Sequence, residues 1–143
     1  MIVKNSSIKL ETRGNFDIKD ITSNVQNAVA GSDVDAGVVN IFVPGATGAV
    51  ATIECEKGLL EDFRNFFEDI IPADGEYKHN LSHAGRNGHS HVRASLLGPS
   101  LTVPVREGVA VLGTWQRIVF IDMDSQPRSR SIMLTIMGHG KVS

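Results

Sequence analysis

Four strand-like segments follow one another through the last third of the chain, and they limit the possible folds more than any other feature. "SLTVPV" (100–105) and "GVAVLG" (108–113) meet at "REG", and "TWQRIVFIDMD" (114–124) and "RSRSIMLTIMG" (128–138) meet at "SQPR". Apolar, β-branched segments separated by such short polar turns are typical of β-hairpins. The sequence therefore predicts sequential antiparallel hairpins at this end of the chain.

Three further strands are predicted nearer the N-terminus. Residues 2–12 alternate polar and apolar side chains, and residues 36–44 are rich in valine and isoleucine. The turn "GATG" at 45–48 leads into a third apolar segment at 49–56, and we expect these last two strands to form a buried hairpin.

Three helices are predicted between the strands. Residues 17–32 carry apolar side chains at helical spacing, with Gly31 as a left-handed cap, and residues 58–72 carry a broad apolar stripe expected in the core and ended by a proline. A short helix over 90–99 has Ser90 as its N-cap candidate. Helices interrupting a strand-rich chain indicate an α+β fold with mostly antiparallel pairing.

Composition narrows the class of protein further. The 143 residues suit one domain over 1–143, and a net charge of −2 argues against a nucleic-acid partner. No apolar run approaches the roughly 20 residues of a membrane span, and the first residues lack the pattern of a signal peptide. The single cysteine, Cys55, excludes an internal disulfide, so we expect a cytoplasmic protein without a membrane partner.

Histidines are concentrated in one short stretch. "HNLSHAGRNGHSH" holds four of the five histidines of the chain: His79, His83, His89 and His91. Neutral imidazole is a good ligand for divalent transition metals, and a polar, glycine-bearing segment suits converging ligands. A solvated polar loop, or separate hydrogen bonds to the backbone, would explain the same residues.

Arginines provide candidate anion sites. Arg86 and Arg93 flank the histidines and could hold a phosphate through paired hydrogen bonds, with Asn87 as a neighbouring substrate contact; surface charge is the alternative. Arg128 and Arg130 follow the penultimate strand and form a second candidate.

Other polar candidates lie outside the histidine stretch. Glu54 ends an apolar strand and suits a metal ligand or acid/base group, or else a charge at a sheet edge. Cys55 beside it is expected to be packed rather than nucleophilic. Thr114 and Gln116 follow a flexible glycine and flank an indole, which suits ligand contact as well as a turn.

The segments "HVRASLLGPSLTVPVREGVAVLGTWQRIVFIDMD" and "RSRSIMLTIMG" closely resemble the YjbQ family, a group of small proteins linked to secondary thiamine-phosphate synthase activity. "FVPGATGAVATIE" and "GLLEDFRNFFEDIIP" fit the same order of elements, so the resemblance covers nearly the whole chain. It implies an α+β domain with a mostly antiparallel, β-sandwich-like core, two main helices and a short third, assembled as a homotrimer.

The resemblance also implies a set of site residues. The family's shared residues match His79 after Tyr77, Ser90 with His91, Glu54, the run Gly113–Gln116 and, approximately, Arg128 and Arg130. The chain departs from the family at Gly45, where many members have a histidine, and His83 and His89 are candidates to replace that ligand.

These observations lead to one main hypothesis and two rivals. The main hypothesis is a transferase resembling thiamine-phosphate synthase that acts on phosphorylated small molecules with a divalent metal, zinc first. Its metal ligands are His79, His83, His89 and His91; Glu54 and His79 are catalytic; and the substrate contacts are Arg86, Asn87, Arg93, Thr114, Gln116 and Arg130. The rivals are a non-catalytic trimeric module that binds a metal or anion, and a structural assembly protein whose histidines line a subunit boundary.

Overall fold

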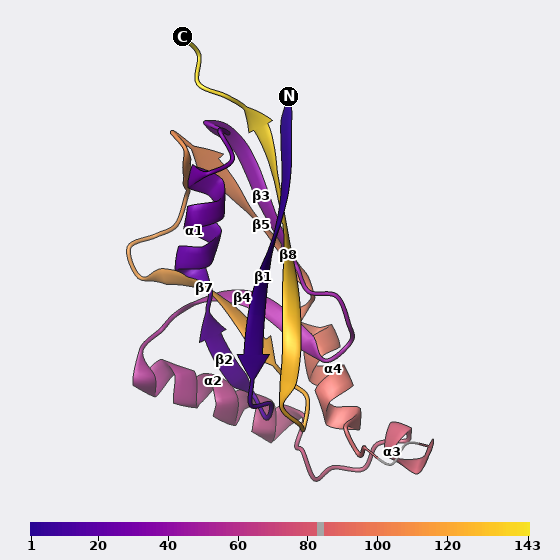
Figure 1. Cartoon of the computed structure of the whole chain (residues 1–143). Coiled ribbons are helices and arrows are strands. Elements are labelled where there is room, and N and C mark those ends of the chain that lie inside the picture. Colours follow the sequence, from indigo (N-terminus) through magenta and orange to yellow (C-terminus); the bar gives the residue numbers. More distant parts are fainter. Residues whose placement is uncertain (83–84) are drawn as a thin grey trace.

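A computed structural model describes residues 1–82 and 85–143 of the chain, and it contains two antiparallel β-sheets and four helices in that part (Figure 1). The strands are β1 (Ile2–Thr12), β2 (Asp17–Asp20), β3 (Ala36–Phe42), β4 (Gly48–Glu54), β5 (Ser100–Arg106), β6 (Val109–Ala110), β7 (Gln116–Asp122) and β8 (Arg128–His139). The helices are α1 (Thr22–Ala30), α2 (Lys57–Ile70), α3 (His79–Ser82) and α4 (Gly88–Leu97). The predicted α+β class is confirmed.

Strand order separates segments that are neighbours in the sequence. The five-stranded sheet has the order β1-β8-β3-β5-β6, and the three-stranded sheet has the order β2-β7-β4. The predicted hairpin of β5 with β6 is confirmed, with Val105 opposite Ala110. The predicted hairpins of β3 with β4 and of β7 with β8 are wrong, because both turns carry the chain from one sheet into the other.

The three-stranded sheet is buried on both faces. Along β7, Ile118 and Phe120 pack into the core that the two sheets share with α1. Val119 and Ile121 point the other way, into a second core that includes Phe67 of α2 and Ala94 of α4. A strand covered on both faces carries a continuous apolar run rather than an alternating one, which explains "IVFI" in this strand.

Several helix boundaries differ from the sequence prediction. The segment 17–20 forms β2 against β7, so α1 begins only at Thr22, and Gly31 has a right-handed φ of −83° rather than a left-handed one. Glu56 leaves the strand to cap α2, where its carboxylate accepts hydrogen bonds from the N–H groups of Gly58 and Leu59. The described residues also include the short helix α3, where the sequence indicates a loop.

The apolar stripe of α2 is only partly covered. Phe67 is 3% exposed in the second core, whereas Phe66 and Ile70 are 55% and 48% exposed. Helices α2, α3 and α4 lie at the end of the molecule opposite the two termini (Figure 1). Among the described residues, no helix is both long and apolar enough to cross a membrane.

Candidate functional site

The candidate site lies where the segment between α2 and α4 folds back on the start of α4. The Tyr77 hydroxyl donates a hydrogen bond to the carbonyl of Pro72 at 2.6 Å. The N–H of Gly88 donates to Asn80 Oδ1 at 2.9 Å, which ties α3 to the first residue of α4. A Cβ on Gly88 would lie 2.5 Å from the Cβ of Tyr77, so only glycine allows this close approach.

Two of the predicted histidine ligands meet at this fold. The rings of His79 on α3 and His91 on α4 have centroids 4.7 Å apart, at an interplanar angle of 60°. Both side chains are half-buried. The structure thus brings together two imidazoles that are twelve residues apart in the sequence.

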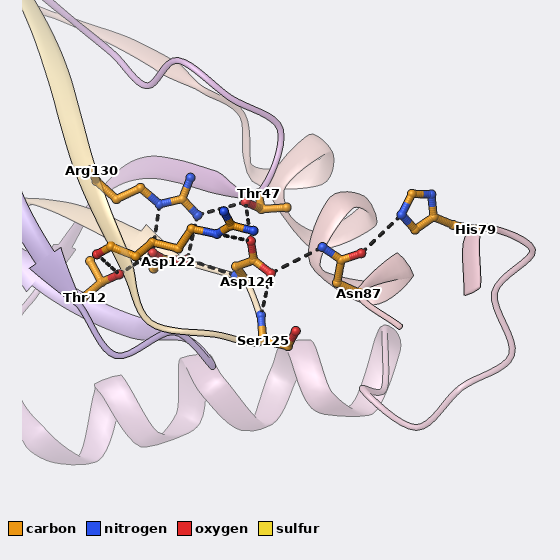
Figure 2. Close-up of polar contacts among 9 residues, drawn as sticks. Thr12, Thr47, His79, Asn87, Asp122, Asp124, Ser125 and Arg130 are labelled. Atoms are coloured by element: carbon orange, nitrogen blue, oxygen red, sulfur yellow. Dashed lines mark hydrogen bonds and ion pairs between the residues drawn. The ribbon is translucent and has the colours of Figure 1, made fainter. Parts of the chain in front are cut away.

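Asn87 links this imidazole pair to the sheets. Its Nδ2 donates to Asp124 Oδ1 at 3.3 Å, and its Oδ1 lies 3.2 Å from His79 Nε2 (Figure 2). Because an ionised carboxylate only accepts hydrogen bonds, Asp124 fixes the orientation of the amide. The amide oxygen that faces His79 is an acceptor, so it favours a ring N–H at Nε2 of His79.

Asp124 gathers several donors just after β7. It is 2% exposed, and it accepts hydrogen bonds from the N–H of Ser125, from Asn87 and from Arg128 Nε at 2.8 Å. Burial raises the pKa of Asp124, but these hydrogen bonds outweigh it, so the pKa lies below its usual value. The carboxylate is therefore charged at neutral pH and holds Asn87 and Arg128 in place.

A second buried carboxylate fixes Arg130. Asp122 accepts two hydrogen bonds from Arg130, at 2.8 and 2.9 Å, and further ones from the Thr12 hydroxyl and the N–H of Asp124 (Figure 2). Arg130 Nη2 also donates to the Thr47 hydroxyl at 2.8 Å. Asp122 is fully buried, so this pair links β1, β7, β8 and the turn before β4.

A small hollow lies between α4 and the turn before β4. Its volume is about 210 Å³, and it is lined by Gly45, Ala46, Gly48, Ala94, Ser95 and Pro99. Arg130 Nη1, which forms no hydrogen bond within the described part of the chain, lies 3.6 Å from the position a Cβ would take on Gly45. Ser95 follows His91 by one helical turn, so the hollow lies on the same face of α4 as His91.

His89 does not join the imidazole pair, contrary to the sequence interpretation. Helix α4 begins at Gly88 with Asn87 as its N-cap, not at Ser90, so His89 and His91 lie on opposite faces of the helix. His89 is 6% exposed, its ring centroid lies 6.3 Å from that of Tyr77, and its Nδ1 has no partner among the described residues. Burial first, and then the charge of Arg93, lower its pKa.

We expect His89 to make the fold sensitive to acid. Since the pKa of His89 is depressed in the folded state, its contribution to stability is complete above the unfolded pKa of about 6.5 and is lost as pH falls below it. In urea unfolding at pH 7.5, 6.5 and 5.5, H89Q should lose less stability on acidification than the wild type. The exposed His139 gives the matched control, H139Q; equal pH dependence in H89Q and the wild type would contradict the assignment.

The other residues predicted near the histidines have different positions. Arg93 is 5% exposed and donates to the carbonyl of Ile71 and to Glu68, so it joins α4 to α2 and is not available to a ligand. Arg86 is exposed and lines a cavity of about 540 Å³ together with Tyr77 and Lys78. His83 lies outside the described residues.

Glu54, Thr114 and Gln116 lie at the opposite end of the three-stranded sheet. Glu54 pairs with Gln116, whereas Gly48, at the other end of β4, pairs with Asp122. Six residues of β-strand span about 20 Å, so the predicted catalytic carboxylate and the His79–His91 pair are far apart within one chain. Cys55, beside Glu54, is exposed rather than packed, and partial burial, followed by the charge of Asp20, raises its pKa.

Comparison with known proteins supports the order of these elements. Residues 6–139 match the family described as UPF0047 protein YjbQ-like. The chain belongs to the UPF0047 family. It is 38% identical to the UPF0047 protein of Methanothermobacter thermautotrophicus over 96% of this chain and 94% of that protein. It is 39% identical to the one of Archaeoglobus fulgidus over 89% of this chain and 96% of that protein.

A solved structure of the UPF0047 family shows the same fold. The crystal structure of a YbjQ-like protein of unknown function from Sulfolobus solfataricus has a TM-score of 0.91 and 35% identity to this chain. The match covers 96% of this chain and 98% of that protein. The predicted membership of the YjbQ family is confirmed, and with it the predicted YjbQ-like fold.

Three site residues of this UPF0047 chain were missed from the sequence: Asp122, Asp124 and Thr47. The pattern "IDMD" indicates the two carboxylates, since they directly follow the continuous apolar run "IVFI" of a strand. A charged group in such a place is buried only if it is paired. Both are paired with arginines of β8, and those arginines were named from the sequence without their partners.

Proposed function

We propose that the His79–His91 pair and the neighbouring hollow bind a phosphorylated small molecule together with a divalent metal, zinc first. The observation that carries the proposal is the meeting of these two imidazoles beside Asn87, whose amide lies 3.2 Å from His79 Nε2 and is held by Asp124. Second-layer hydrogen bonds of this kind orient histidine ligands in metal sites.

The two imidazoles fit a metal site that keeps a position open for water or a ligand better than a site filled by four protein ligands. Within residues 1–82 and 85–143, no three His, Cys, Asp or Glu side chains are grouped to hold a metal. Catalytic zinc sites keep three protein ligands and one open position. His79 and His91 supply two of these, so water, the ligand itself or a further side chain must complete the set.

Cationic groups beside the imidazoles favour a phosphorylated ligand. The hollow is lined by Gly45, whose Cβ position would lie 3.6 Å from Arg130 Nη1, and by Ser95, one helical turn after His91. Arg128 is exposed while its Nε is fixed by Asp124. The absence of a side chain on Gly45 leaves room for a ligand oxygen over the guanidinium of Arg130. A phosphate there would gain charge-assisted hydrogen bonds without moving the buried Asp122–Arg130 pair.

The transfer we propose is the one implied by the family resemblance. A pyrimidine-methyl diphosphate would lose diphosphate as the nitrogen of a thiazole phosphate forms a bond to its methylene carbon. A bound divalent metal would neutralise charge on the leaving diphosphate; Arg128 and Arg130 would hold the phosphate groups, and His79 would be oriented by Asn87. We place this activity in a cytoplasmic homotrimer.

A second candidate is a trimeric module that binds a metal or anion without turnover. The separation of Glu54 from the imidazoles favours it, because the predicted acid/base carboxylate is about 20 Å away from them along β4 in the same protomer. The two candidates share the His79–His91 pair and differ only in whether product forms.

The test measures metal and product separately. H91A should weaken Zn²⁺ binding in calorimetry by about 100-fold or more, because one imidazole cannot hold the ion alone, while the circular dichroism spectrum stays unchanged. H139A on β8 is the matched control and should bind like the wild type. Unchanged Zn²⁺ binding in H91A would refute the metal site. If the wild type binds Zn²⁺ but forms no thiamine phosphate, the second candidate, a binding module without turnover, is the one supported.

A further inference from the structure

The end of the three-stranded sheet that lies away from the His79–His91 pair carries another cavity. It has a volume of about 520 Å³ and is lined by Asp20, Glu54, Cys55, Glu56, Thr114, Trp115 and Arg117. We call this surface the tryptophan end, and the surface around His79, Asn87 and His91 the histidine end. The loop before β7 and helix α3 lie on opposite sides of the molecule (Figure 1).

The tryptophan end presents a large, exposed apolar side chain on a hydrogen-bonded loop. Trp115 is 71% exposed. Its loop is nevertheless held by Gln116, whose Oε1 accepts from the N–H of Gly113 at 3.0 Å and whose Nε2 donates to Thr52 at 3.1 Å. A preorganised, exposed indole is typical of the centre of a protein interface, where aromatic anchors carry much of the binding energy.

The histidine end offers a matching surface. Val92 and Leu96, on the helix that carries His91, are 46% and 60% exposed. Each end also has charged groups without an ion pair within the described part of the chain: Glu54 at the tryptophan end, and Lys78 and Arg86 at the histidine end. Asp74 and Glu76 line the same cavity as these two cations and would repel Glu54. Attraction of Glu54 to this surface is therefore confined to Lys78, Arg86 and the imidazole groups.

We infer that the tryptophan end of one copy covers the histidine end of the next, so that Glu54 and Trp115 complete the site at His79 and His91. Two different surfaces that fit each other make a head-to-tail contact, which closes into a ring with one composite site per copy. A ring of three agrees with the proposed homotrimer. The inference rests on the proposed function in that it assigns both ends to one site.

The arrangement would resolve the separation of Glu54 from the imidazoles. Within one chain the carboxylate is about 20 Å away along β4, but across the contact it comes from the neighbouring copy. The partner's Glu54 would then stand beside His79 and His91 as the missing carboxylate, and Trp115 would exclude water from the ligand.

Cross-linking tests the contact without any ligand. Cys55 is exposed and is the only cysteine, so V92C adds one thiol at the histidine end. A short bis-maleimide should link the two thiols between chains and give dimers and trimers on a denaturing gel; L96C should do the same. V92C with C55S, and N27C with the native Cys55, are the controls and should remain monomeric on the gel.

The outcome separates the two proposals. A protein that is monomeric by light scattering, or an oligomer in which V92C and L96C give no more cross-links than N27C, would overturn the head-to-tail contact. Neither result depends on metal, so the site could fail to span two copies while H91A still abolishes Zn²⁺ binding. Conversely, cross-linking without any Zn²⁺ binding would retain the contact and refute the metal.

Discussion

D122N should lower the free energy of unfolding by about 3 kcal/mol, because it leaves the guanidinium of Arg130 buried without its partner. Asp122 is fully buried and the Arg130 side chain is 11% exposed, so water cannot replace the lost carboxylate. The same change removes the charged acceptor of the Thr12 hydroxyl. Urea unfolding, followed by circular dichroism at pH 7, measures the loss.

The chain offers a matched control in a second Asp–Arg pair that also has one partner on β7. Asp20 and Arg117 are bonded at 2.7 Å, but their side chains are 33% and 40% exposed. Exposed pairs contribute about 1 kcal/mol or less, so D20N should cost far less than D122N. The double variant D122L/R130M should recover much of the lost stability, since it removes both buried charges. Equal losses in D122N and D20N would show that burial does not decide the effect.

The sequence predicted the elements of this fold better than their pairing. Strand β1 has the predicted boundaries, although buried and exposed side chains alternate only in its second half, at Ile8, Leu10 and Thr12. The turns after β3 and β7 were predicted, but a turn signal shows where the chain reverses and not which sheet receives the next strand. Burial of β7 on both faces, which follows from that crossing, could not be deduced from periodicity alone.

The prediction of the site was wrong for His89 because the start of helix α4 was placed incorrectly. Placing the N-cap at Ser90 kept His89 outside the helix and free to converge with His91. The actual cap, Asn87, starts the helix three residues earlier and turns His89 toward Tyr77. Asn87 has no side-chain capping bond because its amide is engaged with His79 and Asp124, so the usual capping signal is missing at the residue that positions the site.

The distance between Glu54 and the imidazoles is the second reason why the sequence did not predict the site correctly. Its position at the end of an apolar strand suggested chemistry, but strand register decides which end of the sheet it occupies. Register places Glu54 opposite Gln116 and leaves the histidine end to Asp122 and Asp124. Residues named together from the sequence are therefore divided between two surfaces, and only contact between copies would reunite them.

G88A should disrupt the histidine end while leaving both cores intact. The added Cβ would meet the Cβ of Tyr77 at 2.5 Å and its Cγ at 2.9 Å, so the segment carrying α3 must move away from α4. His79 would then lose its place beside Asn87 and His91. Changes in groups that orient metal ligands typically weaken binding 10- to 100-fold, and we expect a loss of about that size in Zn²⁺ calorimetry.

Gly85 provides the control for this change. A Cβ there would come no closer than 3.8 Å to Asn87 Oδ1, an ordinary contact, so G85A should bind Zn²⁺ like the wild type. The imidazole NMR signals of His79 and His91 give a second measurement that needs no metal, and they should shift in G88A but not in G85A. Because the Tyr77–Gly88 approach is what holds the two rings 4.7 Å apart, unchanged signals in G88A would mean that the rings are positioned by something other than this glycine.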